Sequence, residues 1–353
     1  MSARTVLDAL RSTGVAAAIA SALLFGASTP LAKRLLEQTG PWMLAGLLYL
    51  GSGLGLTVWR MATRAPAQRL AGGQWAWLAG ALLSGGILAP VLLLYGLARM
   101  PASGAALLLN AEGVFTALIA WVVFRENVDR RVALGMALIV GACVVLSWPG
   151  RPAVDAVLPA LAVLGACALW GIDNNLTGRV SLADARWVAA AKGWTAGIVN
   201  LSIALTTGAP LPAPGTIALA AVLGWLSYGL SLTLFVVALR HLGAARTGAY
   251  FSLAPFAGAA LALALGESAT PTLALAALLM AIGVWLHLNE RHRHRHTHAA
   301  IEHSHPHRHD DLHHRHAHDP AIAPGKVHTH AHRHEAITHD HPHYPDEHHR
   351  HTH

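Results

Sequence analysis

The sequence is poor in charge and in cysteine. Only 12% of its 353 residues are Asp, Glu, Lys or Arg, whereas 54% are hydrophobic. Its two cysteines, Cys143 and Cys167, lie inside apolar runs, so the sequence indicates neither a disulfide framework nor a Cys-x-x-Cys metal site. No groove-like pattern of basic and aromatic residues occurs, so the formal net charge of +7 does not indicate a nucleic-acid partner.

The charges of the first 289 residues separate long apolar runs. These runs are about 18 to 24 residues long, the length a helix needs to cross about 30 Å of hydrocarbon. We therefore predict an all-α polytopic membrane protein in a lipid bilayer, with ten transmembrane helices and a polar tail. The expected spans are 14–36, 41–61, 74–98, 101–124, 131–148, 157–178, 187–206, 216–239, 244–266 and 270–289.

Basic residues are distributed unequally between the two sides of these spans. Twelve Lys and Arg residues fall in the connections on one side and four on the other. By the positive-inside rule, both termini are expected in the cytoplasm of a bacterial-type inner membrane.

The chain also contains an internal echo. Residues 24–34 align with residues 169–179, with Leu, Gly, Leu and Arg repeated at matching positions. This favours a duplicated five-helix unit, with repeats at 1–149 and 150–289. Because five is odd, the second repeat must enter the membrane inverted, as in many secondary transporters whose substrate site lies at the repeat interface.

Ionisable residues inside the spans are few. Asp173 stands with Asn174 and Asn175 in one span, and Lys192 lies at a similar depth in the next, so we expect the acid and the ammonium to meet. Glu112 lies near the middle of its span. Intramembrane acids are costly and are therefore candidate sites for substrate or protons.

Each candidate has a structural alternative. Asp173 and Lys192 form either a purely structural ion pair or a substrate or proton site in which Lys192 keeps the carboxylate ionised until it is displaced. Glu112 is either a proton or cation site or a protonated acid bonded to a neighbouring helix.

Weaker candidates for the same pathway are Asn110, Ser28, Thr29 and Trp170. Trp170 would line a cavity on this reading, but aromatic residues in spans more often make packing or lipid contacts. Glu126 and Glu267 end their spans, so we expect them to reach water and assign them no chemistry.

The chain resembles the EamA-type permeases of the drug/metabolite transporter superfamily in two places. One is the first helix, where a glycine is followed by polar residues and a proline. The other is the fourth helix, where the pattern of Pro101–Leu118 is followed by Phe124-Arg125-Glu126. The resemblance covers about residues 14–289 and implies a transporter of small metabolites, amino acids or ions rather than an enzyme. Members usually carry Pro where this chain has Gly113, whereas the second repeat keeps Pro255.

The last segment, 290–353, holds 23 of the 25 histidines and few large apolar residues, so we expect disorder. Neutral imidazole suits Ni(II), Co(II) and Zn(II), which we expect the tail to bind reversibly, with no tightly bound cofactor. The alternative is a solvated, pH-sensitive tail without metal. Candidate ligands follow a His-x-His pattern: His292, His294, His296, His298, His303, His305, His307, His309, His328, His330, His332 and His334.

Together, the EamA-like body and this tail are similar to cobalt/nickel-resistance exporters. That similarity implies export of Ni(II), and with it Co(II), in exchange for protons. Two other functions remain open: an amino-acid or metabolite exporter with a metal-buffering tail, and a membrane-anchored metal store or sensor. The sequence leaves open whether the chain acts alone or as a homodimer.

Overall fold

The computed structural model describes residues 13–64, 73–123, 130–148, 154–178, 180, 185–242, 247 and 250–288, and four short strands after residue 290. The chain divides into two compact units, Met1–Glu290 and Arg291–His353. The described elements of the first unit are α2 (Thr13–Leu36), α3 (Pro41–Ala62), α4 (Gln74–Ala81), η1 (Leu82–Leu88), α5 (Ala89–Leu97), α6 (Ala102–Leu108), α7 (Ala111–Val122), α8 (Arg130–Ser147), α9 (Val154–Gly178), α10 (Ala185–Thr206), α11 (Pro214–Gly224), η2 (Trp225–Leu230), α12 (Ser231–Leu242), α14 (Ala254–Ala264) and α15 (Pro271–Leu288).

Eight segments of the described chain are long and apolar enough to cross a membrane. They are Gly14–Leu36, Pro41–Ala62, Gln74–Leu97, Ala102–Val122, Arg130–Ser147, Val157–Thr177, Arg186–Thr206 and Pro214–Phe235. These ranges follow the first eight predicted spans to within a few residues. Two shorter apolar helices, Ala254–Ala264 and Pro271–Leu286, fall within the last two predicted spans.

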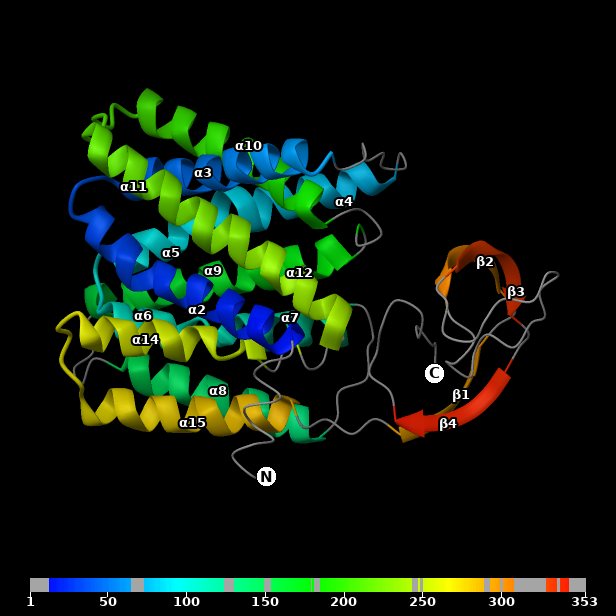
Figure 1. The fold of residues 1–353 in the computed structure, drawn as a ribbon. Helices are drawn as coiled ribbons and strands as arrows, with labels where there is room; N and C mark the ends of the chain where they lie inside the picture. The colour runs from blue at the N-terminus through cyan, green and yellow to red at the C-terminus, as the bar shows by residue number, and fades with distance from the viewer. Residues whose placement is uncertain are drawn as a thin grey trace. The chain divides into compact units, whose positions relative to one another are not determined.

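The helices pair across the two halves of the chain (Figure 1). α3 packs against α10, and α8 packs against α15. α2 packs against α12 and α14, while α9 packs against α5 and α7. Each half therefore contributes to the packing of the other.

Close approach of α3 and α10 depends on small residues. A Cβ added to Gly193 would lie 2.5 Å from the backbone nitrogen of Gly53, a distance that no real side chain tolerates. Two serines join α2 to α12 reciprocally: Ser21 Oγ donates to the Ser231 carbonyl at 2.7 Å, and Ser231 Oγ donates to the Ser21 carbonyl at 2.9 Å. Small residues and interhelical hydrogen bonds are what hold helices together in lipid.

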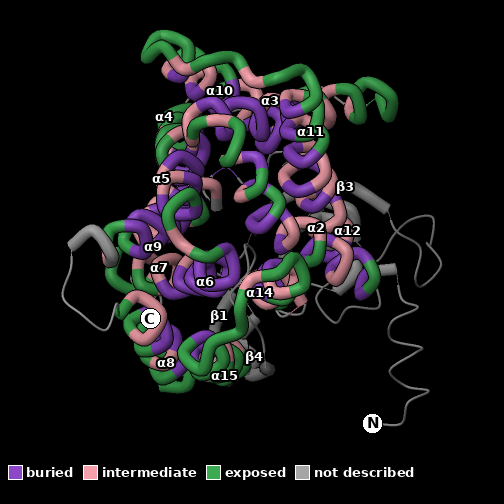
Figure 2. The backbone as a smooth tube through the Cα atoms, turned by 90° about the vertical axis from the view of Figure 1, so that its left-hand side faces the viewer, coloured by how far each residue is buried: buried purple, intermediate pink, exposed green. Residues whose placement is uncertain are grey.

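Burial is uneven among the helices (Figure 2). All seven residues of α6 are buried, whereas α8 and α15 alternate buried residues with exposed ones along their length. The exposed side chains include large apolar ones such as Val58, Trp121, Leu134 and Trp285. An apolar outer surface of this kind suits a lipid environment.

Glu267, in the connection between α14 and α15, binds the start of α6. Its Oε1 accepts the Ala102 N–H at 2.6 Å and its Oε2 accepts the Ser103 N–H at 2.8 Å. Partial burial by itself raises the pKa of Glu267, but these hydrogen bonds and the charge of Lys33 hold the pKa below its usual value. The structure thus adds a structural role for Glu267, which was expected only to reach water, whereas Glu126 lies outside the described residues.

The histidine-rich unit contains four short strands, which differs from the expected disorder. They are β1 (Arg293–His298), β2 (Ile301–His307), β3 (His328–His334) and β4 (Ile337–Pro342), with β1 antiparallel to β4 and β2 antiparallel to β3. A His-x-His pattern has a period of two, which matches the alternation of a strand. His292 and His309 lie outside the described residues.

The contacts of Glu267 predict a pH-dependent contribution to stability. Because its pKa is lowered on folding, the ionised carboxylate stabilises the protein fully above about 4.3, the usual glutamate value, and less as the pH falls through the folded value. Glu267→Gln should therefore lower stability by about 1 kcal/mol at pH 7 and by less in acid. Thermal unfolding of the purified protein across this pH range measures the difference. The exposed Glu37→Gln is the control, and an equal, pH-independent loss in both variants would contradict the assignment.

Candidate functional site

Asp173 is a buried acid of the first unit, with 6% of its surface exposed. The Lys192 Nζ lies 2.5 Å from Asp173 Oδ1, so the predicted meeting of these residues is confirmed. Thr177, one turn further along α9, donates its hydroxyl to the same oxygen at 2.8 Å, and Lys192 also donates to Thr177 Oγ1 at 3.0 Å. The result is a closed triad of carboxylate, ammonium and hydroxyl.

Glu112, in the first turn of α7, faces Asn174, the residue that follows Asp173 on α9. Asn174 Nδ2 donates to Glu112 Oε1 at 2.9 Å and to Thr116 Oγ1 at 3.2 Å. Asn175 Nδ2 donates to the backbone carbonyls of Thr116 at 3.1 Å and Gly171 at 2.8 Å. Glu112 is thus bonded to a neighbouring helix, which is the geometry that the structural alternative requires and that a proton site also permits.

The two acids occupy neighbouring parts of one polar cluster. Asp173 and Asn174 are consecutive on α9, so the residue that binds Lys192 and the residue that binds Glu112 lie on the same helical turn. Asn174 is exposed and Glu112 is half-buried, whereas Asp173 is buried. The cluster therefore extends from the interior of the unit to its surface.

The turn η1 shapes the space beside Asp173. Ala89 N–H, which would bond the Gly85 carbonyl in an α-helix, donates to the Ser84 carbonyl instead. The next residue is Pro90, which has no N–H to donate. The Gly85 carbonyl is left available for partners outside its own helix.

Two side chains from other helices donate hydrogen bonds to that carbonyl. Tyr49 Oη on α3 and Trp170 Nε1 on α9 each donate to the Gly85 oxygen at 3.0 Å. A Cβ added at Gly85 would lie 2.0 Å from Asp173 Oδ2, so only glycine leaves room for the carboxylate. Trp170 is thus connected to the site through its hydrogen bond to Gly85.

The remaining candidates lie outside this network as described. Asn110, between α6 and α7, donates to the Leu107 carbonyl at 3.0 Å and approaches Met280 Sδ at 3.6 Å. Ser28 and Thr29 are buried in α2, where Ser28 Oγ donates to the Phe25 carbonyl at 2.6 Å. The structure therefore does not join these three residues to the acids.

Sequence reasoning missed Tyr49, Gly85, Thr116 and Thr177. The Gly85-Gly86 pair followed by Pro90 inside an apolar span was the available signal for η1, because glycine and proline are where helices depart from α geometry. The threonines carried no signal of their own, since a threonine inside a helix more often bonds its own backbone.

Metal binding by the helical unit would need several ligating side chains close together. No group of three or more His, Cys, Asp or Glu residues that could hold a metal ion is found among the residues whose side chains are described. Of the tail candidates, the structure describes only the backbone of those within β1, β2 and β3.

Comparison with known proteins relates the chain to a family of transporters. The model of the EamA-like transporter family matches the chain twice, over residues 12–148 and 157–289. An uncharacterized transporter of Methanothermobacter thermautotrophicus is 32% identical over 181 residues, which are 49% of this chain and 52% of that protein. The match thus spans about half the length of that relative.

Two further similarities concern a shorter segment and the fold. The probable 4-amino-4-deoxy-L-arabinose-phosphoundecaprenol flippase subunit ArnE of Pseudomonas fluorescens is 40% identical over 89 residues, which are 25% of this chain and 75% of that protein. A solved crystal structure superposes with a TM-score of 0.61 at 18% identity, covering 79% of this chain and 99% of the other. The last similarity shows the fold alone.

The tight fit at Gly85 predicts a specific sensitivity. Gly85→Ala should push the Asp173 carboxylate away from Lys192 and lower stability by about 1–3 kcal/mol, the usual effect of overpacking. Gly141→Ala is the matched control, because an added Cβ there meets nothing within 4 Å. Thermal unfolding of both purified variants measures the effect. Equal stability of the two variants would contradict the proposed crowding of Asp173.

Proposed function

The chain belongs to the EamA-like transporter family, and from that premise we propose that it is a secondary-active permease that exports Ni(II), and with it Co(II), from the cytoplasm in exchange for protons. It is a multi-pass membrane protein and a transporter rather than an enzyme. The observation that carries the choice of substrate is the tail, with 23 histidines in 64 residues joined to a permease body.

Strand pairing in the tail supports a metal-collecting role. In the β2–β3 ladder, His303 pairs in register with His332, His305 with His330 and His307 with His328. Residues two apart in a strand share one face of the ladder, so these register positions fall on a common face. Several neutral imidazoles on one face suit reversible binding of Ni(II), Co(II) or Zn(II).

The proposed topology has ten spans in two inverted repeats, 1–149 and 150–289, followed by the tail at 290–353. The reciprocal pairing of α2 with α12 and of α9 with α5 is what a pseudo-twofold relation between the repeats would produce. The excess of basic residues on one side supports cytoplasmic termini, which would place the tail in the compartment from which the cation is exported.

In this mechanism, the polar cluster on α9 carries the exchange. The Lys192 ammonium pairs with Asp173 Oδ1, and an arriving cation or proton competes with the ammonium for that oxygen. Glu112, bonded to the exposed Asn174, supplies the second proton-binding group. Protons that reach either acid from the non-cytoplasmic side would displace the cation to that side.

Two other functions are distinguished by their substrates. An amino-acid or metabolite exporter with a metal-buffering tail would confer tolerance to amino-acid analogues and not to nickel. A membrane-anchored metal store or sensor would show no transport in vesicles, and deleting the tail would remove its whole phenotype.

Transport by inside-out vesicles tests the site. Labelled Ni(II) should accumulate with a proton gradient, and Asp173→Asn or Glu112→Gln should abolish accumulation. Removing one partner of a buried pair also destabilises by about 3–5 kcal/mol, so stability is measured in parallel. The double variant Asp173→Asn/Lys192→Met should regain stability without regaining transport. Full transport by that double variant would identify the pair as purely structural.

Deletion of residues 290–353 tests the tail. The shortened protein should still transport labelled Ni(II), because the proposed exchange site lies in the helical unit, but with a weaker apparent affinity. The measurement is the concentration dependence of uptake into vesicles that hold equal amounts of protein. Complete loss of uptake would place the transport site in the tail instead.

A further inference from the structure

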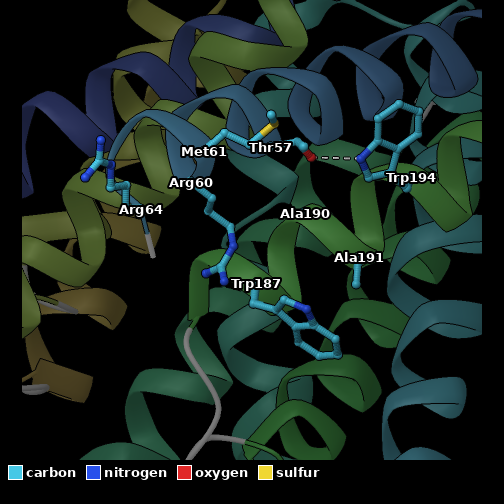
Figure 3. Close-up of a pocket in the computed structure, with 8 residues that line it drawn as sticks. All are labelled: Thr57, Arg60, Met61, Arg64, Trp187, Ala190, Ala191 and Trp194. Atoms are coloured by element: carbon cyan, nitrogen blue, oxygen red, sulfur yellow. Dashed lines mark hydrogen bonds between the residues drawn. The ribbon is translucent and has the colours of Figure 1, made fainter. Parts of the chain in front are cut away.

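A separate cavity of about 400 Å³ lies where α3 ends beside the first turns of α10 (Figure 3). Its lining includes two arginines and two tryptophans, and the Arg60 side chain extends toward Trp187, whereas the Arg64 side chain extends away from it (Figure 3). The lining residues used here are Thr57, Arg60, Met61, Arg64, Trp187 and Trp194. None of them belongs to the polar cluster of Asp173 and Glu112.

The helix ends place this cavity at the edge of the membrane. α3 and α10 are both candidate spans, and the cavity lies at the C-terminal end of the first and the N-terminal end of the second. Tryptophan and arginine concentrate where hydrocarbon meets water. Trp194 Nε1 donates to Thr57 Oγ1 at 2.9 Å, which fixes one indole ring in the wall.

Arg64 has a backbone conformation that normally favours glycine. It is the only non-glycine residue with positive φ in the described chain, at 47°, and it follows Thr63, the residue that caps α3. Glycine is the usual residue at this position because it has no Cβ to strain the left-handed conformation. The chain instead keeps a cation there, next to the cavity.

The surface beside the cavity is apolar. Met61, which lines it, is 74% exposed, and Val58, one turn of α3 before it, is 65% exposed. A soluble anion would gain nothing from these side chains. A molecule with an anionic head and an apolar tail would contact both the arginines and this exposed face.

We propose that this cavity binds the headgroup of an anionic phospholipid. Arg60 and Arg64 contact the phosphate, which guanidinium groups bind in a bidentate manner, and the acyl chains lie along the exposed face of α3 at Val58 and Met61. The site is independent of the transported substrate.

The test uses the purified full-length protein in detergent. Phosphatidylglycerol should raise the unfolding temperature, whereas phosphatidylcholine with the same acyl chains and inorganic phosphate should not. Arg60→Gln/Arg64→Gln should weaken the apparent affinity for phosphatidylglycerol about tenfold or more. Arg130→Gln, at the exposed start of α8, should leave it unchanged.

Arg64→Gly separates lipid binding from folding. Glycine relieves the left-handed backbone, so this variant should be at least as stable as the wild type without lipid and should show a smaller stabilisation by phosphatidylglycerol. Equal weakening in Arg130→Gln would indicate general attraction to the surface and overturn the site. Stabilisation by inorganic phosphate alone, or an undiminished lipid response in Arg64→Gly, would overturn it as well.

Discussion

The pairing of the Asp173 carboxylate with the Lys192 ammonium, 2.5 Å apart, is the interaction on which the membrane unit depends. A carboxylate in hydrocarbon costs several kcal/mol unless it is paired and hydrogen-bonded. Thr177 satisfies the same oxygen, and Gly85 leaves the only space in which the other oxygen fits. The relative positions of α9, α10 and η1 are therefore constrained together.

The π-helical turn extends this constraint to a fourth helix. Because Pro90 cannot donate to the Gly85 carbonyl, Tyr49 from α3 and Trp170 from α9 bind it instead. α3 in turn packs against α10 through Gly53 and Gly193, and α10 carries Lys192. The contacts thus form a closed circuit through α3, α10, α9 and η1, in which a change at one helix is felt at the ion pair.

Charged residues at the helix ends have a different role from the charged residues inside the spans. The Glu267 carboxylate binds the N–H groups at the start of α6, and Arg64 stands at the C-terminal end of α3. Each charge complements the dipole of the helix end that it occupies. Arg64 also stands next to the cavity that is proposed to bind a phospholipid headgroup.

Much of this protein was predictable from local patterns. Apolar runs separated by charges predicted the eight described spans and the regions of α14 and α15. The depths of Asp173 and Lys192 on successive helices predicted their contact. Hydropathy and helical rise are enough for both predictions, because a membrane limits where a helix can begin and end.

The sequence by itself thus determined a polytopic helical membrane protein and its intramembrane acids. Only the tertiary structure decided that Asn174 binds Glu112, that Gly85 receives Tyr49 and Trp170, and that Glu267 reaches α6 from 165 residues away. Those contacts depend on which face each helix turns inward and on the register between distant helices. Nearly every helix face is apolar here, so hydrophobic periodicity could not distinguish the inward face from the one that meets lipid.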